Sequence, residues 1–469
     1  MRVILVRPPS TLGVLRQTTS LHHPIGLALL AAVAEKAGHQ AEIVDYEVMP
    51  YDLNFILKHD PDVVALTAMT PTIHSAYRIA VGLQEAGYKK PIVLGGVHAT
   101  VLPKRSLIEA AGAIDAVVVG EGEKRFPQML AVLQGKADYT EMDGVAWRDR
   151  DQIHLQPCRE RLADLDEYPF PDRDKIRMEL YDQTSSPGFS RRFLKITEIF
   201  TSRGCAHDCT FCVAALLAGR RVRYRSLALV EQEMKQCINR YSIEHFTICD
   251  DNFGASRRRV VEFCERTAPL NVTWTCESRV TTVDPELLTT MKRAGCRKIS
   301  FGLEAASTAG LARVKKNIDA ESIGNAFAWT RRAGIKRGAF FLVGSHPEET
   351  KEDIAAIEQL FLRIDPDYIV VSIATPYPGT ELQRQMKEKN LVIDEDWAQY
   401  RAFTEKPRWR TVHFTPTQLV SMQHRLIRRF YLRPRIVWRH LRAVGSWREM
   451  CYLMSSLWAL IRLIGARRE

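Results

Sequence analysis

The residues best suited to metal binding or catalysis are three closely spaced cysteines in the middle of the chain. They are Cys205, Cys209 and Cys212, within "RGCAHDCTFC". Thiolates bind iron-sulfur clusters because soft sulfur matches iron, and this spacing lets three sulfurs on one loop reach three corners of a cube. No fourth thiol is suitably placed, since Cys237 follows 25 residues later inside a helical pattern. An open iron can take its last ligand from a substrate or cofactor, as catalytic zinc does. A zinc site and three ordinary buried thiols are the alternatives.

The segment that must position these cysteines is a series of β-like runs separated by helix-period segments. It begins at Phe193 with "FLKITEIF", directly before the cysteines, and continues with "IEHFTICDDNF", "NVTWTCESRV", "CRKISFGLEAAS", "KRGAFFLVGSHPEE" and "DYIVVSIATPYPGTEL". Six strands of one period predict a (β/α)6 partial barrel over residues 193–385, with its catalytic groups at the carboxyl ends of the strands.

A different α/β pattern precedes it. Residues 1–136 contain five short apolar runs, each followed by a loop or helix, which predict a doubly wound, Rossmann-like parallel sheet. Ligands of such sheets bind beyond the carboxyl ends of the strands. Small or polar residues stand at three of those ends: Thr67, Thr70, Gly95, Gly96, His98, Gly120, Glu121 and Gly122. They are candidate contacts to a large flat ligand, although the glycines also suit simple turns.

The remaining segments have other compositions. Residues 137–192 are polar and carry "DLDEYPFPDRD", which predicts a linker. Residues 386–469 read as a basic, aromatic and helical C-terminal region. The stretch from Arg401 to Glu469 holds 15 Lys plus Arg against 3 Asp plus Glu, so the net charge of +11 comes from the tail.

The cysteine motif with Phe211 before its last thiol, followed by a β/α series, resembles the radical S-adenosylmethionine (SAM) superfamily. The doubly wound segment ahead of it is similar to the cobalamin-binding branch, which includes methylases and an anaerobic porphyrin cyclase. The resemblance covers roughly residues 1–385. It implies a 4Fe-4S cluster on the three cysteines, with SAM on the open iron and cobalamin on the first domain. It also implies a reductant such as flavodoxin or ferredoxin.

The resemblance carries over to further positions one at a time. Phe211 looks like the aromatic residue near adenine. Asp250 and Asp251 resemble the polar motif near the methionine amino group, and Glu304 and Arg279 resemble SAM-binding residues of neighbouring strand ends. Gly344 and Pro376 lie in segments similar to the adenine-side motifs of the fifth and sixth strands. Each of these residues also suits a structural role, such as a helix cap.

One departure from the branch concerns cobalt. Many cobalamin domains carry Asp-x-His-x-x-Gly after the first strand, whereas this loop reads "RPPSTLGVLRQTTSLHHPIG". His22 and His23 lie in the loop and are expected to serve hydrogen bonding or capping. We therefore expect a lower cobalt face without a histidine.

The composition and the C-terminal region indicate where in the cell the protein is expected and which partners it could contact. The chain of 469 residues is 46% hydrophobic. It shows no secretory signal and no apolar run of the roughly 18 residues that a membrane span needs. We therefore expect the protein in the cytoplasm. The arginines of the tail stand among Tyr431, Trp438, Trp447 and Trp458, which suits either a helical cap on the barrel or contact with the inner membrane surface. Nucleic acid is disfavoured, because the RNA-modifying members of the superfamily carry a cysteine-bearing N-terminal domain and the first cysteine here is Cys158.

These observations predict a cobalamin-dependent radical SAM enzyme that acts on a small, hydrophobic molecule, most simply as a C-methyltransferase at an unactivated carbon. A porphyrin-cyclase-like enzyme that forms rings, oxidises or rearranges without methyl transfer is the nearest alternative. A non-catalytic metal protein that binds membrane or RNA is the second.

Overall fold

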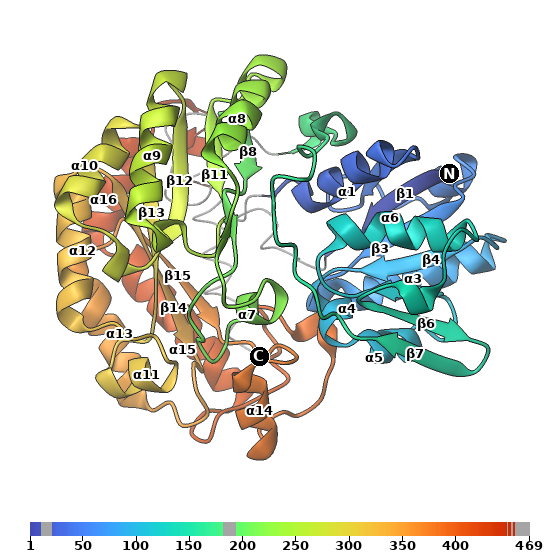
Figure 1. Ribbon diagram of the computed structural model, residues 1–469. Coiled ribbons are helices and arrows are strands. Elements are labelled where there is room, and N and C mark those ends of the chain that lie inside the picture. The colour runs from blue at the N-terminus through green and yellow to red at the C-terminus, as the bar shows by residue number, and fades with distance from the viewer. Residues whose placement is uncertain (11–20, 182–193, 448, 452–453, 455–469) are drawn as a thin grey trace.

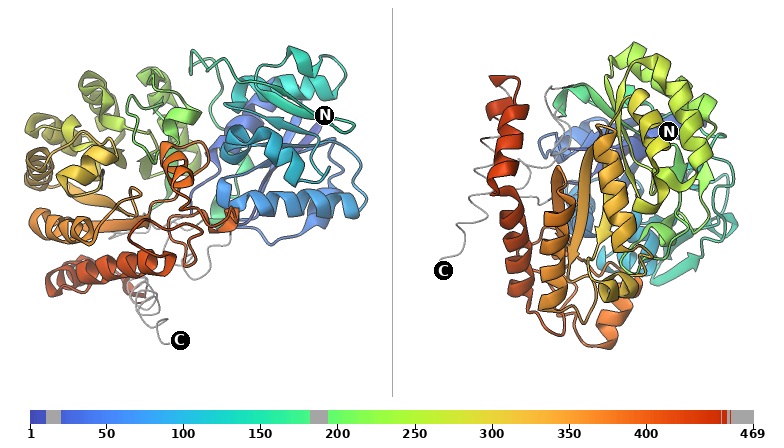
Figure 2. Two further views of the ribbon diagram at one scale, coloured as in Figure 1. Left: turned by 90° about the horizontal axis from the view of Figure 1, so that it is seen from below. Right: turned by 90° about the vertical axis from the view of Figure 1, so that its left-hand side faces the viewer.

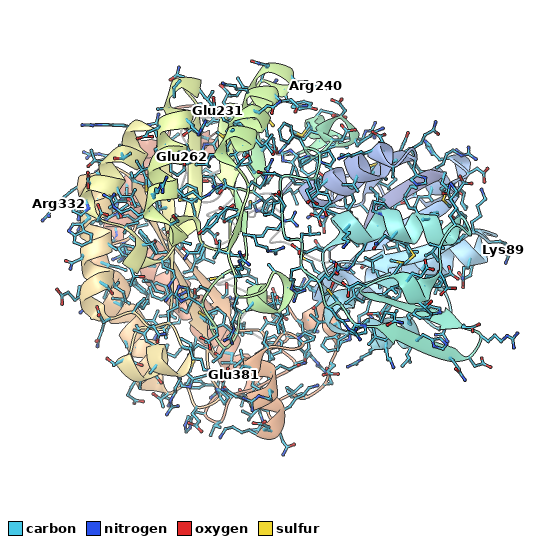
Figure 3. The ribbon with its side chains drawn as sticks, viewed as in Figure 1. Lys89, Glu231, Arg240, Glu262, Arg332 and Glu381 are labelled. Atoms are coloured by element: carbon cyan, nitrogen blue, oxygen red, sulfur yellow. The ribbon has the colours of Figure 1, made fainter. Side chains whose placement is uncertain are left out.

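A computed structural model describes residues 1–10, 21–181, 194–447, 449–451 and 454 of the chain. Figure 1 shows two α/β domains side by side, with the N-terminal domain in blue to teal and the second domain in green to orange. Exposed charges such as Lys89, Arg240 and Arg332 point outward from the rim of the molecule (Figure 3).

The N-terminal sheet has seven strands in the order β2-β1-β3-β4-β5-β6-β7. Their bounds are β1 Arg2–Arg7, β2 Gln40–Asp45, β3 Val63–Thr67, β4 Ile92–Gly95, β5 Ala116–Val118, β6 Val145–Asp149 and β7 Gln152–Gln156. Strands β1 to β5 are parallel, which confirms the doubly wound prediction. The strand order reverses between β1 and β3, the kind of switch point at which such sheets bind ligands.

Helices cover both faces of this sheet: α1 Ile25–Lys36, α2 Leu53–Lys58, α3 Ile73–Glu85, α4 Val97–Val101, α5 Pro103–Glu109 and α6 Gly122–Leu133. The run "VILV" in β1 is buried on both sides because its side chains alternate between the faces. Val3 and Leu5 join the core beneath α1 and α6, whereas Ile4 and Val6 join the core beneath α3.

The segment predicted as a linker differs from the structure in one respect. Residues 145–156 form the antiparallel pair β6 and β7, which extends the first sheet beyond residue 136. The polar composition concealed this pair because β7 is an edge strand with little buried surface. The connector after it is held to the second domain by the buried Arg173, which donates to Thr197 Oγ1 at 3.2 Å and to the Glu198 carbonyl at 2.9 Å.

The second domain is an open six-stranded parallel barrel in the order β15-β14-β13-β12-β11-β8, as predicted. Its strands are β8 Ile196–Ile199, β11 His245–Ile248, β12 Thr273–Ser278, β13 Cys296–Glu304, β14 Lys336–Val343 and β15 Tyr368–Ile373, with a small ribbon of β9 Ser202–Arg203 and β10 Arg223–Tyr224. Its helices are α7 Ala214–Leu217, α8 Leu227–Tyr241, α9 Arg257–Thr267, α10 Pro285–Arg293, α11 Thr308–Arg313, α12 Ala320–Arg332, α13 Lys351–Ile364 and α14 Glu381–Glu388. Capping boxes start α12 and α13, so the sequence itself fixes where these helices begin.

The C-terminal region adds α15 Pro416–Tyr431 and α16 Pro434–Ala443 along the outside of the barrel (Figure 2). Helix α15 provides hydrogen-bond donors to backbone carbonyls on the free edge of β15. Gln423 donates to the Val371 carbonyl and Tyr431 to the Ile369 carbonyl, each at 2.8 Å. The described part of this region is thus a helical cap on the barrel. Within the described residues, no helix has the length and apolar character that crossing a membrane requires.

Candidate active site between the two domains

The cysteine loop leaves the carboxyl end of β8 through the β9–β10 ribbon. Gly204 precedes Cys205 with a φ of +95°, and a Cβ there would lie 2.6 Å from the Arg221 carbonyl, so the turn requires glycine. Cys205 and Cys209 are partly buried and Cys212 is exposed, all as free thiols. Burial raises the pKa of Cys205 and of Cys212, and the neighbouring Cys209 adds to both shifts, so the three thiols lie close enough to interact.

The donor set of this loop, three thiols within eight residues, fits an iron-sulfur cluster. No group of three or more ligating side chains among the described residues is gathered tightly enough to hold one metal ion. An iron-sulfur cube offers a separate iron to each thiolate. Cys205, Cys209 and Cys212 would hold such a cluster.

The two aspartates after β11 brace the loop. The carboxylate of Asp250 accepts from Thr201 N at 2.7 Å and from the Ser202 hydroxyl at 2.6 Å, and burial raises its pKa. Asp251 accepts from Gly204 N at 2.8 Å and remains exposed. Of the two predicted SAM contacts, Asp251 is therefore the one with surface to offer a ligand.

Arg279 and Glu304 meet at the ends of β12 and β13 through a residue that the sequence did not single out. Lys316 donates to Glu304 Oε1 at 3.2 Å, and its carbonyl accepts from the buried Arg279 guanidinium. Glu304 has a φ of +68°, a conformation unusual for a residue with a side chain. Phe211 packs on the small apolar cluster of Ala305, Leu311 and Val314. Phe211 and Glu304 thus lie near each other at one end of the barrel.

The two remaining predicted SAM residues are buried. A Cβ on Gly344 would lie 3.3 Å from Leu419 of α15, so this glycine faces the C-terminal cap. Its N–H donates to the Glu349 carboxylate at 2.6 Å, and burial raises the pKa of Glu349 to about 7. Pro376 is buried just beyond β15.

A cavity of about 440 Å³ lies at the carboxyl edge of the N-terminal sheet. Its lining comes from the ends of β1 and β3 and from the predicted residues Thr67, Gly95, Gly96, Gly120 and Gly122. Glu198, Phe200 and Cys249 of the barrel close its other side, so the cavity lies between the two domains.

Glycines form the cradle of this cavity. A Cβ on Gly95 would approach only the Val118 carbonyl, at 4.0 Å, and one on Gly26 would meet nothing within 4 Å, so larger residues at these two positions would grow into the open space. Gly96 and Gly120 have positive φ angles of 93° and 89°. A glycine-lined space at the switch point fits a broad flat ligand such as cobalamin, which these residues would hold.

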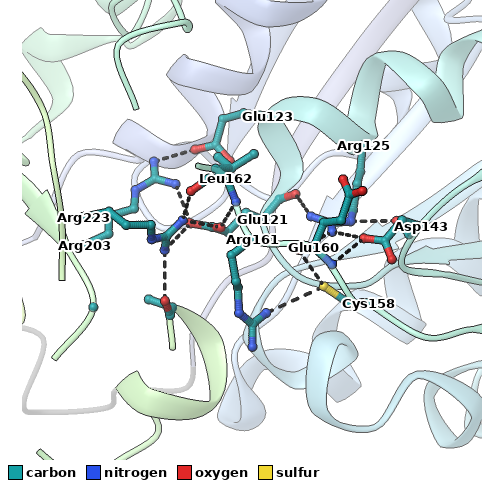
Figure 4. Close-up of polar contacts among 12 residues, drawn as sticks. Glu121, Glu123, Arg125, Asp143, Cys158, Glu160, Arg161, Leu162, Arg203 and Arg223 are labelled. Atoms are coloured by element: carbon teal, nitrogen blue, oxygen red, sulfur yellow. Dashed lines mark hydrogen bonds and ion pairs between the residues drawn. The ribbon is translucent and has the colours of Figure 1, made fainter. Parts of the chain in front are cut away.

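Three other predicted cobalamin contacts serve other partners. Thr70 lies 3.2 Å from Nδ1 of the buried His98, whose ring packs edge-on against Trp397 of the C-terminal region. Glu121 points away from the cavity into an ion-pair network that joins the two domains (Figure 4).

In this network Glu121 binds Arg223 through two contacts of 2.8 and 2.9 Å and Arg203 at 3.3 Å, while Glu123 pairs with Arg203. Burial acts to raise the pKa of Glu121, but Arg223 and its other partners hold it below its usual value. Because Arg203 lies two residues before Cys205, these contacts tie the glycine loop of the cavity to the cysteine loop.

His22 and His23 also bridge the domains. Both Nδ1 atoms lie 2.8 Å from the carboxylate of Glu198 on β8, which keeps the pKa of Glu198 at about 2 despite its burial. Both histidines line the cavity. Their predicted hydrogen-bonding role is therefore seen, and its partner lies about 175 positions away in sequence.

Comparison with known proteins agrees with this geometry. Residues 11–130 match the B12 binding domain family and residues 199–361 match the Radical SAM superfamily. An uncharacterized methyltransferase of Pyrococcus horikoshii, PH0819, is 31% identical over 445 residues, which cover 93% of this chain and 94% of that protein. The chain belongs to the cobalamin-binding radical SAM family. It is accordingly an enzyme whose cofactors are a 4Fe-4S cluster, SAM and cobalamin.

Two further members of this family are instructive. The anaerobic magnesium-protoporphyrin IX monomethyl ester cyclase of Cereibacter sphaeroides is 28% identical over 98% of this chain and 75% of its own length. TsrM from Kitasatospora setae, a radical SAM methyltransferase solved with cobalamin and a [4Fe-4S] cluster, superposes with a TM-score of 0.71 at 18% identity and 99% coverage of both chains. The second likeness establishes the shared fold.

Proposed function

We propose that this protein is a C-methyltransferase that adds a methyl group to an unactivated carbon of a small molecule. The observation that carries the proposal is the cavity between the glycine cradle of the first domain and the mouth of the barrel, whose lining residue Glu123 pairs with Arg203 ahead of the cysteines. When bound, the cluster and SAM supply a 5′-deoxyadenosyl radical for hydrogen abstraction, and cobalamin supplies the methyl group.

The chain's own residues hold and orient these groups. Cys205, Cys209 and Cys212 would ligate the cluster. The SAM contacts would be Phe211, Asp251, Arg279 and Glu304. Cobalamin would contact Thr67, Gly95, Gly96, Gly120 and Gly122. We place the cobalamin domain at residues 1–156, the connector at 157–193, the barrel at 194–385 and the cap after it. The ion pairs of Figure 4 fix the two domains at one separation, and such fixed geometry is what a reaction between two cofactors needs.

Methyl transfer is favoured over the cyclase alternative by the relatives. The methyltransferase of Pyrococcus horikoshii aligns along nearly its whole length at the higher identity, whereas this chain covers three quarters of the cyclase. The cyclase remains the second candidate because it too matches almost all of this chain.

Two partners complete the proposal. SAM cleavage needs one electron, which a flavodoxin or ferredoxin would deliver.

Trp438 and Trp447 of the C-terminal region are 56% and 80% exposed beside several arginines, which supports peripheral contact of a cytoplasmic protein with an anionic membrane.

The test is a single anaerobic assay with two readouts. Protein purified without oxygen from cobalamin-supplied cells should contain iron and cobalt, and with methyl-deuterated SAM and a strong reductant it should release 5′-deoxyadenosine and S-adenosylhomocysteine and label an acceptor. Cys209→Ala should lose the iron and at least a hundredfold of the SAM cleavage. Acceptor turnover without methyl label would favour the cyclase-like alternative, and full cleavage by Cys209→Ala would refute the cluster assignment.

A further inference from the structure

Glu277 is an acidic residue on the inner wall of the barrel. It belongs to β12, which lies between β11 and β13 (Figure 1). Its neighbours Cys276 and Ser278 are buried, and Cys276 packs into the core beneath the outer helices. Because side chains alternate along a strand, Glu277 points the opposite way, into the barrel interior. Although it stands on a central strand, its side chain is exposed, so that interior is open at this point.

The other acids around this space already have partners. Glu198 is bound by His22 and His23, and Glu304 is bound by Lys316. In the described parts of the chain, no hydrogen bond or ion pair reaches the carboxylate of Glu277. Burial raises its pKa, Lys298, His22 and Lys316 oppose the rise, and Glu304 adds to it. Glu277 thus stands in the open interior of the barrel, and no donor from the described residues bonds its carboxylate.

Its electrostatic neighbours come from both the interdomain cavity and the proposed SAM contacts. His22 acts electrostatically on Glu277 from the same ring that binds Glu198 and lines the interdomain cavity. In the other direction, Arg279 follows Glu277 by two residues, and Glu304 belongs to the neighbouring strand end. Ser300, in register with Glu277 on β13, forms a hydrogen bond with the Tyr368 hydroxyl at 2.5 Å. The carboxylate therefore lies between the cavity and the proposed SAM contacts.

We propose that Glu277 receives a protonated amine of the methyl acceptor, an inference that rests on the proposed methyltransferase function. An ammonium ion supplies both the opposite charge and the hydrogen bonds that the described residues do not give this carboxylate. A neutral hydroxyl would supply a hydrogen bond without the opposite charge. Anchoring at this point orients the rest of the substrate, whose body would lie along the apolar wall of the cavity, so that one carbon faces both cofactors.

The first test modifies the acceptor. The holoenzyme is incubated with methyl-deuterated SAM, reductant and a small-molecule extract of the source organism, half of which is first treated with acetic anhydride in neutral water to convert amines into uncharged amides. Labelled product should form from the untreated half and be lost from the acetylated half. Equal labelling of both halves would overturn the amine assignment while leaving the methyltransferase standing. Labelling of neither half would instead refute the methyltransferase proposal and this inference with it.

The second test modifies the protein. With the acceptor fraction from that extract, Glu277→Gln should raise KM about tenfold or more, because a hydrogen bond to a charged group contributes about 1.5–3 kcal/mol, and should change kcat far less. Glu277→Asp should recover part of the loss. Glu321→Gln, on an exposed helix position, makes the same charge change as a control and should behave as the unmodified enzyme. A Glu277→Gln protein with normal cluster absorption and an unchanged KM would refute the proposal; if that variant fails to fold, the acetylation result decides alone.

Discussion

At the scale of single residues, the site is built from polar groups whose roles depend on their partners. Asp250 and Asp251 are adjacent in sequence. Asp250 is buried by its hydrogen bonds to the segment before the cysteine loop, whereas Asp251 bonds Gly204 and remains exposed. Glu121 and Gly122 are also adjacent, and one binds the second domain while the other lines the cavity. Residue type therefore indicated where the sites lie, whereas the hydrogen bonds decided which residue is available to a ligand.

His98 gives a residue-scale prediction about pH. Burial lowers its pKa to about 4, below the 6.5 of a histidine in an unfolded chain. The folded protein thus binds fewer protons there, so stability is full above pH 6.5 and is lost as the pH falls toward 4. Between pH 7 and pH 5 this group should cost about 2 kcal/mol. Denaturant titrations at both pH values should show a loss in the unmodified protein that is smaller by this amount in His98→Gln. An equal loss in both proteins would contradict the prediction.

At the scale of elements, short loops at strand ends do two tasks at once. The loop after β5 lines the cavity through Gly120 and Gly122 and holds the second domain through Glu121. The ribbon after β8 supplies Arg203 and leads into the cysteines. A change at the interface of these loops should therefore reach both cofactor sites.

Glu121→Gln tests this coupling. It leaves Arg223 buried without its carboxylate, and breaking a buried pair costs about 3–5 kcal/mol. We expect a lower denaturation midpoint and a lower ratio of methylated product to 5′-deoxyadenosine, because the domains lose their fixed separation. Glu160→Gln breaks the nearby exposed pair with Lys124 and should cost less than about 1 kcal/mol with an unchanged ratio. An unchanged ratio in Glu121→Gln would show that the network only stabilises the fold.

At the scale of the whole molecule, the C-terminal region closes the barrel and carries the excess charge. Its arginines are partly neutralised by the barrel: Arg435 and Arg439 pair with Asp365. Phe430 and Ile436 are buried, whereas Trp438 and Trp447 remain on the surface. The inward half of this region explains the stability of the barrel edge, and the outward half is the surface proposed to meet lipid.

Vesicle flotation tests that surface. The full chain should float with phosphatidylglycerol vesicles and less with neutral ones, since each arginine near an anionic surface adds about 1 kcal/mol. The double variant Trp438→Ser, Trp447→Ser should bind at least about tenfold more weakly, because burial of one large apolar side chain contributes about 1.5–3 kcal/mol. Tyr51→Ser, another exposed aromatic on the first domain, is the control and should float normally. Equal flotation of all three proteins, or none, would contradict membrane contact through the tail.

The sequence by itself determined the fold class and the order of the two sheets, and it predicts the cluster ligands. Strand and helix periods are local, and Cys205, Cys209 and Cys212 lie within one loop, so their proximity needs no tertiary contact. The same holds for Gly96 and Gly120 after β4 and β5, whose positive φ angles follow from turns within a few residues.

The tertiary structure alone decided how the parts meet. It added β6 and β7 to the first sheet, brought His22 to Glu198 and Glu121 to Arg223, and placed Lys316 beside Glu304. It also turned Gly344 toward α15 and left Glu277 facing open space. The physical reason is the same in each case: a charge or an edge strand is satisfied by whichever group folding brings within about 3 Å, and that group can stand anywhere in the chain.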